Sequence, residues 1–238
     1  MQHSSSISRR SDDRVPPRLR LLLLRHGQVP QVSPRRFLGQ RDVPLDETGE
    51  RQAAAMGRAL GTVRIDRAWC SDLRRAVRTA GLVLDGRDLS AEPTSLLREI
   101  RIGAWEGLSA EELQSRSPGA YEERGRNIAD YRTEGGESFR DVQRRGLRFL
   151  DLLASGEAAP EREPAEGPPV VLAVAHAGLN RGVLCAALEK PLEELFDVGQ
   201  DYCALNVLDL VEGRWVVRAA NVAANAVPDL SSGLLPPL

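Results

Sequence analysis

The sequence has few of the residues that build disulfide frameworks or metal sites. It contains three histidines and three cysteines among 238 residues, and Cys70, Cys185 and Cys203 are far apart with no CxxC spacing. An odd number of widely spaced cysteines is typical of buried thiols in a reducing compartment. We therefore expect no disulfide, no metal site, no cofactor and a cytoplasmic location.

Long apolar runs and an excess of charge of one sign are also lacking. No apolar stretch approaches the roughly 20 residues of a membrane-spanning helix, and residues 1–18 lack the apolar core of a signal peptide. The formal net charge of −2 gives no positive field for a nucleic-acid backbone or an anionic membrane. We expect neither nucleic acid nor a membrane as a partner.

Hydrophobic residues make up 42% of the chain, which is enough for a substantial core. We expect one domain over residues 19–225. The polar, arginine- and serine-rich segment 1–18 is expected to be a disordered tail, and residues 226–238 a C-terminal tail.

Two apolar stretches each end in a histidine. Residues 19–24 lead into Arg25 and His26, and residues 170–175 lead into His176. Such leucine- and valine-rich runs are typical of strands buried on both faces of a parallel sheet. Because the carboxyl ends of parallel strands line the ligand crevice of an open α/β sheet, we expect His26 and His176 to belong to one site.

The rest of the chain alternates between helical and extended patterns. Further strands are expected at 65–70 and 91–96, with a final hairpin at 204–211 and 214–220. Helices are expected from Asp46 to Gly61, from an N-cap at Ser71 to Leu84, at 139–153 and at 179–188. This order predicts an α/β fold, a three-layer α/β/α sandwich with a mostly parallel central sheet and an antiparallel edge strand.

Two segments do not follow this alternation. Residues 27–45 contain Pro30, Pro34 and Pro44, which exclude a continuous helix, and a loop of this length is usually functional. Segment 108–134 is polar and weakly helical, and we expect it to form a cap over the crevice.

The residues around the first histidine suit chemistry at a phosphate monoester. Such chemistry needs a nucleophile, a proton donor for the leaving alkoxide and fixed positive charge for the equatorial oxygens. An imidazole can attack phosphorus directly, and Arg25 beside His26 supplies the planar guanidinium that binds phosphate.

Five motifs resemble, in the same order, those of the histidine phosphatase (phosphoglycerate mutase-like) superfamily. They are LRHG at 24–27, FLGQ at 37–40, SDLRRA at 71–76, LRE at 97–99 with GAWEG at 103–107, and AHAG at 175–178. A single RHG is weak evidence, whereas five ordered motifs between residues 24 and 178, within a resemblance that covers about residues 19–225, are specific. The resemblance implies a phosphoglycerate mutase-like fold and hydrolysis of a phosphate monoester through a phosphohistidine.

Carried over to the matching positions, the resemblance implies a role for each candidate site residue. His26 would be the nucleophile, and Glu99 the general acid and then the base. Arg25, Arg75 and His176 would clamp the phosphoryl group. Further substrate-binding residues would be Gln28, Gly39, Gln40 and Ala177.

Several alternatives stay open at this point. Glu106 competes with Glu99 for the role of acid, and Val32 stands where mutase-like members often carry an asparagine. Ala177 replaces the usual glycine of the second histidine motif. Segment 108–134 lacks the arginine-rich and proline-rich insertion of the cofactor-dependent mutases, which favours a hydrolase.

Within the superfamily, the loop at 37–42, the short cap and the RE/GxWEG pattern are most similar to the α-ribazole phosphatase branch, and they imply α-ribazole 5′-phosphate as the substrate. Trp105, Phe37 or Tyr121 could stack on its flat base. A phosphoglycerate mutase, a broad-specificity phosphatase and a non-catalytic binding module remain the alternatives. The expected partner is a small phosphate monoester, and a homodimer stays open beside a monomer.

Overall fold

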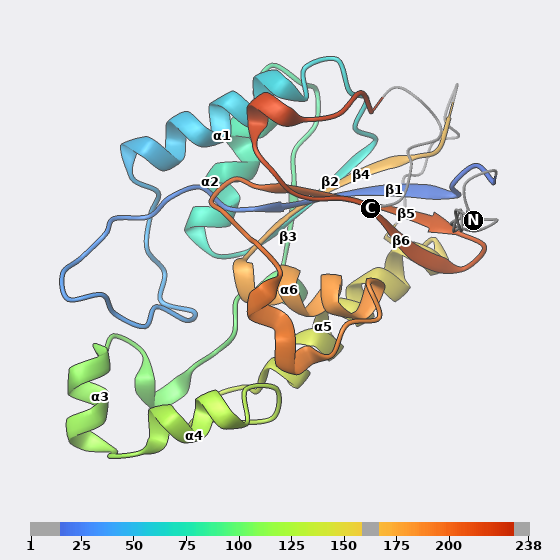
Figure 1. The fold of residues 1–238 in the computed structure, drawn as a ribbon. Helices are drawn as coiled ribbons and strands as arrows, with labels where there is room; N and C mark the ends of the chain where they lie inside the picture. Colours follow the sequence, from blue (N-terminus) through green and yellow to red (C-terminus); the bar gives the residue numbers. More distant parts are fainter. Residues whose placement is uncertain (1–14, 159–166, 231–238) are drawn as a thin grey trace, which may run out of the picture.

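The computed structural model describes residues 15–158 and 167–230, which fold around a sheet of six strands (Figure 1). The strands are β1 (Leu19–Arg25), β2 (Arg67–Ser71), β3 (Glu92–Thr94), β4 (Val170–Ala175), β5 (Leu205–Val211) and β6 (Arg214–Val222). Their order across the sheet is β3-β2-β4-β1-β5-β6. Most of the expected N-terminal tail and the end of the C-terminal tail lie outside the described residues.

Four of the strands are parallel, and the expected hairpin follows them. β1 pairs in parallel with β4, and β2 in parallel with both β4 and β3. β5 is antiparallel to β1, and β6 returns antiparallel to β5. β5 is therefore the antiparallel strand of the sheet, and it lies next to the edge strand β6. Glu212 and Gly213 both have a positive φ, as this tight two-residue turn requires.

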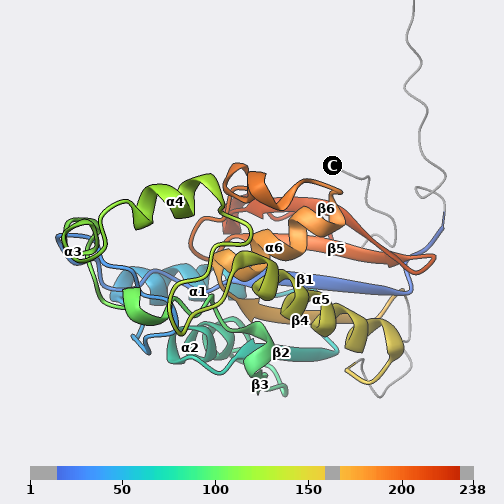
Figure 2. The same ribbon diagram turned by 90° about the horizontal axis from the view of Figure 1, so that it is seen from below.

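Helices cover both faces of the sheet, which confirms the expected three layers. α1 (Glu47–Ala59) and α2 (Arg74–Val83) lie on one face, and α5 (Phe139–Ser155) and α6 (Ala177–Ala187) on the other (Figures 1 and 2). Leu22 and Leu24 of β1 belong to the core cluster under α1 and α2, whereas Leu21 and Leu23 belong to the cluster under α5 and α6. The run of four leucines thus reflects a central strand buried on both faces.

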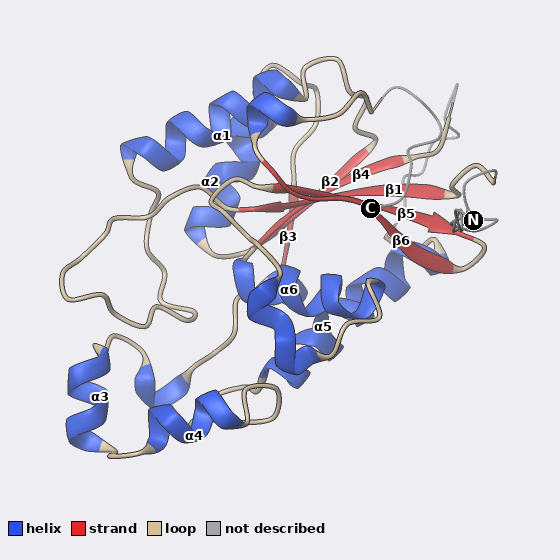
Figure 3. Cartoon of the chain, viewed as in Figure 1, coloured by secondary structure: helices blue, strands red, loops and turns tan. Residues whose placement is uncertain are grey.

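The segment expected to be a cap contains two short helices, α3 (Ala110–Arg116) and α4 (Ala120–Arg126), which lie away from the sheet (Figure 3). Arg36 links this cap to the loop 27–45, because it donates to both carboxylate oxygens of Glu112 at 2.7 and 3.2 Å. Four 3-10 turns complete the described chain: Ser95–Leu97, Gly103–Trp105, Leu192–Asp197 and Ala224–Ala226. Among the helices of the described ranges, none combines the length and apolar character needed to cross a membrane.

Two local expectations are corrected. The strand expected at 91–96 is shorter, because the Thr94 hydroxyl accepts a hydrogen bond from the amide of Leu96 at 3.3 Å and begins a 3-10 turn there. Ser71 is the last residue of β2 and does not cap α2, which begins at Arg74 after Leu73 as its N-cap.

The described chain packs beyond residue 225. Leu230 is buried against the core cluster under α1 and α2. Its carbonyl oxygen accepts a hydrogen bond at 3.1 Å from Nη1 of Arg20, a buried residue of β1.

Candidate active site

β1 and β4 bring the two strand-end histidines together. Arg25 and Ala175 are partners in the parallel register, and the amide of His26 donates to the carbonyl of Ala175 at 3.0 Å. The imidazole rings of His26 and His176 lie edge to face with 4.9 Å between their centroids. Two segments 150 positions apart in the chain therefore meet at one end of the sheet.

The surroundings of His26 define its protonation state. Its Nδ1 lies 2.7 Å from the carbonyl oxygen of Gly27. Because a carbonyl only accepts hydrogen bonds, Nδ1 carries the proton and the lone pair of the neutral ring is on Nε2. Burial, and after it the positive charges of Arg75 and Arg25, hold the pKa of His26 well below its ordinary value. At neutral pH the ring is therefore uncharged, with Nε2 available as a nucleophile.

His176 is fully buried and lies against the ring of His26. Neither of its ring nitrogens has a hydrogen-bond partner among the described residues. Burial holds the pKa of His176 well below its ordinary value, and the neighbouring His26, Arg75 and Arg25 lower it further. An uncharged imidazole with two unpartnered nitrogens is free to hydrogen-bond a group that enters beside His26.

Arg25 is held against an aromatic ring at the end of β1. Its guanidinium carbon lies 3.8 Å from the ring centroid of Tyr202, and its Nη1 donates to the carbonyl of Gln200 at 2.5 Å. Its Nε is buried without a partner among the described residues. The guanidinium is thus held in place by a stacked ring and a carbonyl, neither of which neutralises its charge.

Arg75 comes from α2 and binds the loop that follows β1. It is only 2% exposed, and it donates to the carbonyls of Arg41 at 2.7 Å and Gly39 at 2.9 Å. Gly39 has a φ of +52°, and a Cβ there would lie 2.6 Å from a side-chain carbon of Ile102. The loop that contains the FLGQ motif therefore binds Arg75 through its backbone carbonyls. The conformation of this loop requires glycine at position 39.

Glu99 is fixed by two backbone amides. Its Oε1 accepts from the amide of Ile100 at 2.8 Å and its Oε2 from the amide of Gly178, in the first turn of α6, at 3.1 Å. The competing Glu106 accepts instead from the amide of Gln40 at 3.0 Å and does not line the cavity beside His26. Of these two carboxylates, Glu99 is the one that the structure places at the cavity.

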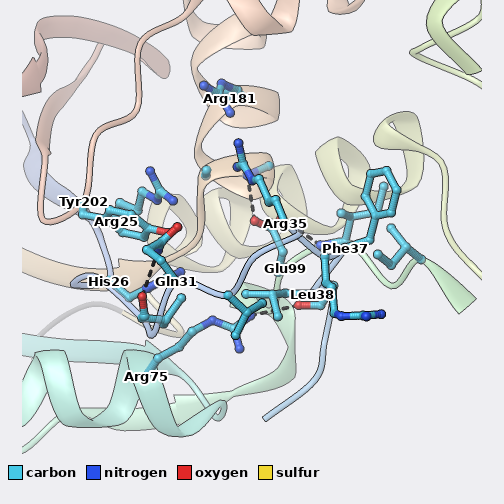
Figure 4. Close-up of a pocket in the computed structure, with 18 of the residues that line it drawn as sticks. Arg25, His26, Gln31, Arg35, Phe37, Leu38, Arg75, Glu99, Arg181 and Tyr202 are labelled. Atoms are coloured by element: carbon cyan, nitrogen blue, oxygen red, sulfur yellow. Dashed lines mark hydrogen bonds between the residues drawn. The ribbon is translucent and has the colours of Figure 1, made fainter. Parts of the chain in front are cut away.

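A cavity of about 540 Å³ collects most of the predicted site residues (Figure 4). Its lining includes Arg25, His26, Gly39, Arg75, Glu99 and Ala177. His176 lies beneath this surface. Gln28 and Gln40 do not line it: the Gln28 amide donates to Asp46 at 3.0 Å, and the Gln40 amide donates to the carbonyl of Glu99 at 2.9 Å. Gln28 therefore binds the N-cap residue of α1, and Gln40 binds the backbone of a residue that lines the cavity.

Sequence reasoning missed several residues of the cavity wall: Gln31, Arg35, Arg124, Arg181, Phe196 and Tyr202. One signal could have found Arg181, because it stands four residues after Ala177 and therefore shares a helix face with it. The position of Tyr202 carried no such signal, because it follows an irregular segment without periodicity.

The three cysteines are free and buried. Burial raises the pKa of Cys70 to about 11 and that of Cys203 to about 12, so both thiols stay protonated. Across residues 15–158 and 167–230, no three side chains of His, Cys, Asp or Glu are grouped so as to hold a metal ion.

The order of the sheet and the paired histidines at the ends of β1 and β4 define a phosphoglycerate mutase-like protein. The sequence profile of the "Histidine phosphatase superfamily (branch 1)" matches residues 21–223. The chain therefore belongs to the histidine phosphatase superfamily, and it is a phosphatase.

The chain is similar to phosphatases with different named substrates. The chain is 37% identical to a glucosyl-3-phosphoglycerate phosphatase of Mycobacterium tuberculosis over 73% of this chain and 77% of that protein. The structure of a mycobacterial glucosyl-3-phosphoglycerate phosphatase complexed with VO3 matches with a TM-score of 0.74 and 33% identity, covering 86% of this chain and 99% of the other. An adenosylcobalamin/alpha-ribazole phosphatase of Salmonella typhimurium is 27% identical over 87% of this chain and 98% of its own length.

Proposed function

We propose that this phosphatase hydrolyses a small phosphorylated metabolite through a phosphohistidine formed at Nε2 of His26. The observation that carries the proposal is the 2.7 Å contact between Nδ1 of His26 and the carbonyl of Gly27, which leaves the lone pair on Nε2. In the first step Nε2 attacks phosphorus and the P–O bond to the leaving group breaks. Protonated Glu99 gives its proton to the leaving alkoxide.

In the second step Glu99, now a carboxylate, takes a proton from water, and the oxygen of that water attacks phosphorus. The P–N bond breaks, inorganic phosphate forms and neutral His26 is restored. The guanidinium groups of Arg25 and Arg75 balance the charge of the transferred group throughout. The unpartnered nitrogens of His176 support its role as a further ligand of a phosphoryl oxygen.

Two substrate classes are supported by different observations. A flat base such as that of α-ribazole 5′-phosphate suits the aromatic wall formed by Phe37 and Tyr121, whose rings lie 6.0 Å apart and line the cavity. The relative from Salmonella supports this class. Trp105 is only 5% exposed and does not line the cavity, so it is not a stacking surface in this arrangement. The mycobacterial relatives, named glucosyl-3-phosphoglycerate phosphatases, support a glucosylated phosphoglycerate.

Trapping the intermediate tests the proposal, because a phosphohistidine survives alkali and is lost in acid. Wild-type protein is mixed with ³²P-labelled p-nitrophenyl phosphate and quenched in denaturant during turnover. We expect label that is stable to alkali in the wild type and in His3→Ala. We expect His26→Ala to lose both label and turnover. Undiminished label in His26→Ala would place the nucleophile elsewhere.

The substrate is tested by comparing kcat/KM for α-ribazole 5′-phosphate, glucosyl-3-phosphoglycerate and 3-phosphoglycerate. A specific enzyme should favour one of them by at least about tenfold, or about 1.4 kcal/mol of transition-state discrimination. Equal values for all three would indicate a broad-specificity phosphatase. Isomerisation of 3-phosphoglycerate faster than hydrolysis of any ester would indicate a mutase.

A further inference from the structure

Three arginines of the cavity wall have no place in the proposed transfer of the phosphoryl group. Arg35 comes from the loop 27–45, Arg124 from α4 and Arg181 from α6. Within the described part of the chain, none of the three forms an ion pair with a carboxylate. In Figure 4, Arg35 and Arg181 lie on the side of the cavity away from Arg75.

Arg124 is partly buried among aromatic rings of the cap and its neighbours. Its guanidinium carbon lies 5.8 Å from the ring centroid of Trp105 and 5.4 Å from that of Phe139. Burial lowers the pKa of Arg124. Aromatic faces attract a cation but carry no net negative charge, so they do not replace a counter-ion.

Arg181 is held with part of its hydrogen-bonding capacity unused. Its Nε donates to the carbonyl of Val198 at 2.9 Å, and its guanidinium carbon lies 5.4 Å from the ring of Phe196. Burial lowers the pKa of Arg181, and repulsion from Arg25 lowers it further. The backbone and the ring fix the direction of the side chain, while its terminal nitrogens have no protein acceptor among the described residues.

The charges around the cavity do not balance. Six arginines line it, Arg25, Arg35, Arg36, Arg75, Arg124 and Arg181, against a single carboxylate, Glu99. Arg36 is neutralised by Glu112, and Arg25 with Arg75 would match one phosphoryl group. This leaves an excess positive charge on Arg124 and Arg181, which are partly buried, so that their charge is costly without an anionic ligand. Arg35 is exposed at the rim of the same cavity and adds a third positive charge there.

We propose that Arg35, Arg124 and Arg181 form a subsite for a second anionic group, a carboxylate or a second phosphate, on the substrate that His26 attacks. This inference rests on the proposed phosphatase function and narrows its substrate to metabolites with two anionic groups. Guanidinium groups are suited to this role because their planar N–H pairs bind carboxylate and phosphate oxygens bidentately. A cavity of about 540 Å³ has room for a small metabolite of this kind.

Matched esters test the subsite. In the first pair, 3-phosphoglycerate has a carboxylate where glycerol 3-phosphate has a hydroxymethyl group. In the second pair, fructose 1,6-bisphosphate has one phosphate more than fructose 6-phosphate. Release of inorganic phosphate gives kcat/KM for each ester. We expect a preference of at least about tenfold for the doubly anionic member of at least one pair. Equal values within both pairs would overturn the subsite.

Substitutions separate the subsite from a general positive field. We expect Arg124→Met and Arg181→Met each to reduce the preference for the second anion about tenfold or more, since each removes a charged hydrogen bond to it. Arg126→Met is the matched control: Arg126 is two residues from Arg124 on the same helix, exposed, and absent from the cavity wall. An equal loss in Arg126→Met, or no loss in either of the first two variants, would overturn the subsite.

Binding answers the same question without turnover. Dissociation constants of 3-phosphoglycerate and glycerol 3-phosphate are measured by calorimetry on His26→Ala. The subsite is supported if His26→Ala binds 3-phosphoglycerate at least about tenfold more tightly than glycerol 3-phosphate and if this ratio falls in the double variant His26→Ala/Arg181→Met. Equal affinities for the two esters in His26→Ala would overturn it. If no ester, including p-nitrophenyl phosphate, is hydrolysed by the wild type, the proposed function fails while this ratio still decides the subsite.

Discussion

At the scale of single residues, the position of Glu99, the proposed general acid, depends on the absence of a side chain at Gly178. The amide of Gly178 donates to Oε2 of Glu99, and a Cβ at Gly178 would lie 2.3 Å from Oε1 of the same carboxylate. A contact of that length cannot be accommodated, so an alanine at Gly178 has to displace either the carboxylate or the start of α6. The AHAG segment at 175–178 therefore fixes the carboxylate of Glu99 and also carries His176.

We expect Gly178→Ala to mimic Glu99→Gln. Loss of a general acid lowers the rate of the chemical step on the order of 10²–10⁴-fold, and Glu99→Gln should lower the rate with alkyl phosphates by about that factor. Gly178→Ala should lower the rate with the same esters at least about tenfold. With p-nitrophenyl phosphate both variants should lose less in the phosphorylation step, because the phenolate leaves without protonation. Single-turnover phosphorylation of both classes of ester measures the difference.

Gly81→Ala is the matched control for the glycine substitution. Gly81 lies in α2, and a Cβ there would meet no atom within 4 Å. The variant should keep full activity and gain about 0.5–1 kcal/mol of stability from helix propensity. An equal loss for alkyl and aryl phosphates in Gly178→Ala would show that the glycine does not act through Glu99.

At the scale of elements, α5 supports the segment that carries Glu99. Arg145 of α5 donates through Nη1 to the carbonyls of Leu96 at 2.9 Å and Arg98 at 2.7 Å, and its Nη2 lies 3.1 Å from Oε2 of Glu137. Both charged side chains are less than one-fifth exposed. The irregular chain before Glu99 thus has its carbonyls tied to a helix that packs on the sheet.

We expect Arg145→Met to lower kcat although Arg145 does not line the cavity. The lost hydrogen bonds involve a charged group and partly buried carbonyls, so the variant should also lose about 1.5–3 kcal/mol of stability. The drop in kcat should be about tenfold with alkyl phosphates and smaller with p-nitrophenyl phosphate, because the acid is displaced. Steady-state kinetics and denaturant unfolding measure the two effects.

The neighbouring Arg144→Met serves as the control. Arg144 is 71% exposed and, among the described residues, its ion pair is with Asp141 at 3.1 Å on its own helix. Exposed pairs of this kind contribute about 0–1 kcal/mol. Its activity and stability should stay near those of the wild type. If Arg145→Met kept the wild-type kcat for alkyl phosphates, α5 would not position the acid.

At the scale of the whole molecule, the two buried histidines make stability depend on pH. Both have a pKa well below 6.5, the ordinary value that they regain on unfolding. Below pH 6.5 the unfolded chain therefore binds protons that the folded chain does not bind, and the free energy of unfolding falls as the pH falls. Above pH 6.5 both states hold the rings uncharged, and these groups contribute no pH dependence.

We expect the free energy of unfolding to fall by up to about 1.4 kcal/mol per pH unit for each histidine between about pH 6.5 and 5. Denaturant titrations across this range measure the slope. The double variant His26→Asn/His176→Asn, which lacks both groups, should show a flatter profile over the same range. An unchanged slope in the double variant would mean that other groups cause the acid sensitivity.

The sequence by itself determined the parts of this protein that follow from local chemistry. Apolar runs ending in His26 and His176 predicted two parallel strands with a shared end, because strands buried on both faces need such runs. Helical periodicity and turn residues predicted the main helices and the hairpin. The ordered motifs indicated the superfamily, to which the chain belongs.

Only the tertiary structure decided which distant side chains meet. The register of β1 and β5 pairs Arg20 with Asp209, which are buried together 2.8 Å apart although the sequence of β1 predicts an apolar interior. In the same way, the packing of the cap and of α6 around one cavity brings Arg124 and Arg181 into its wall. Such contacts depend on register and on helix docking, which sum many weak interactions over the whole chain, so no local pattern in the sequence specifies them.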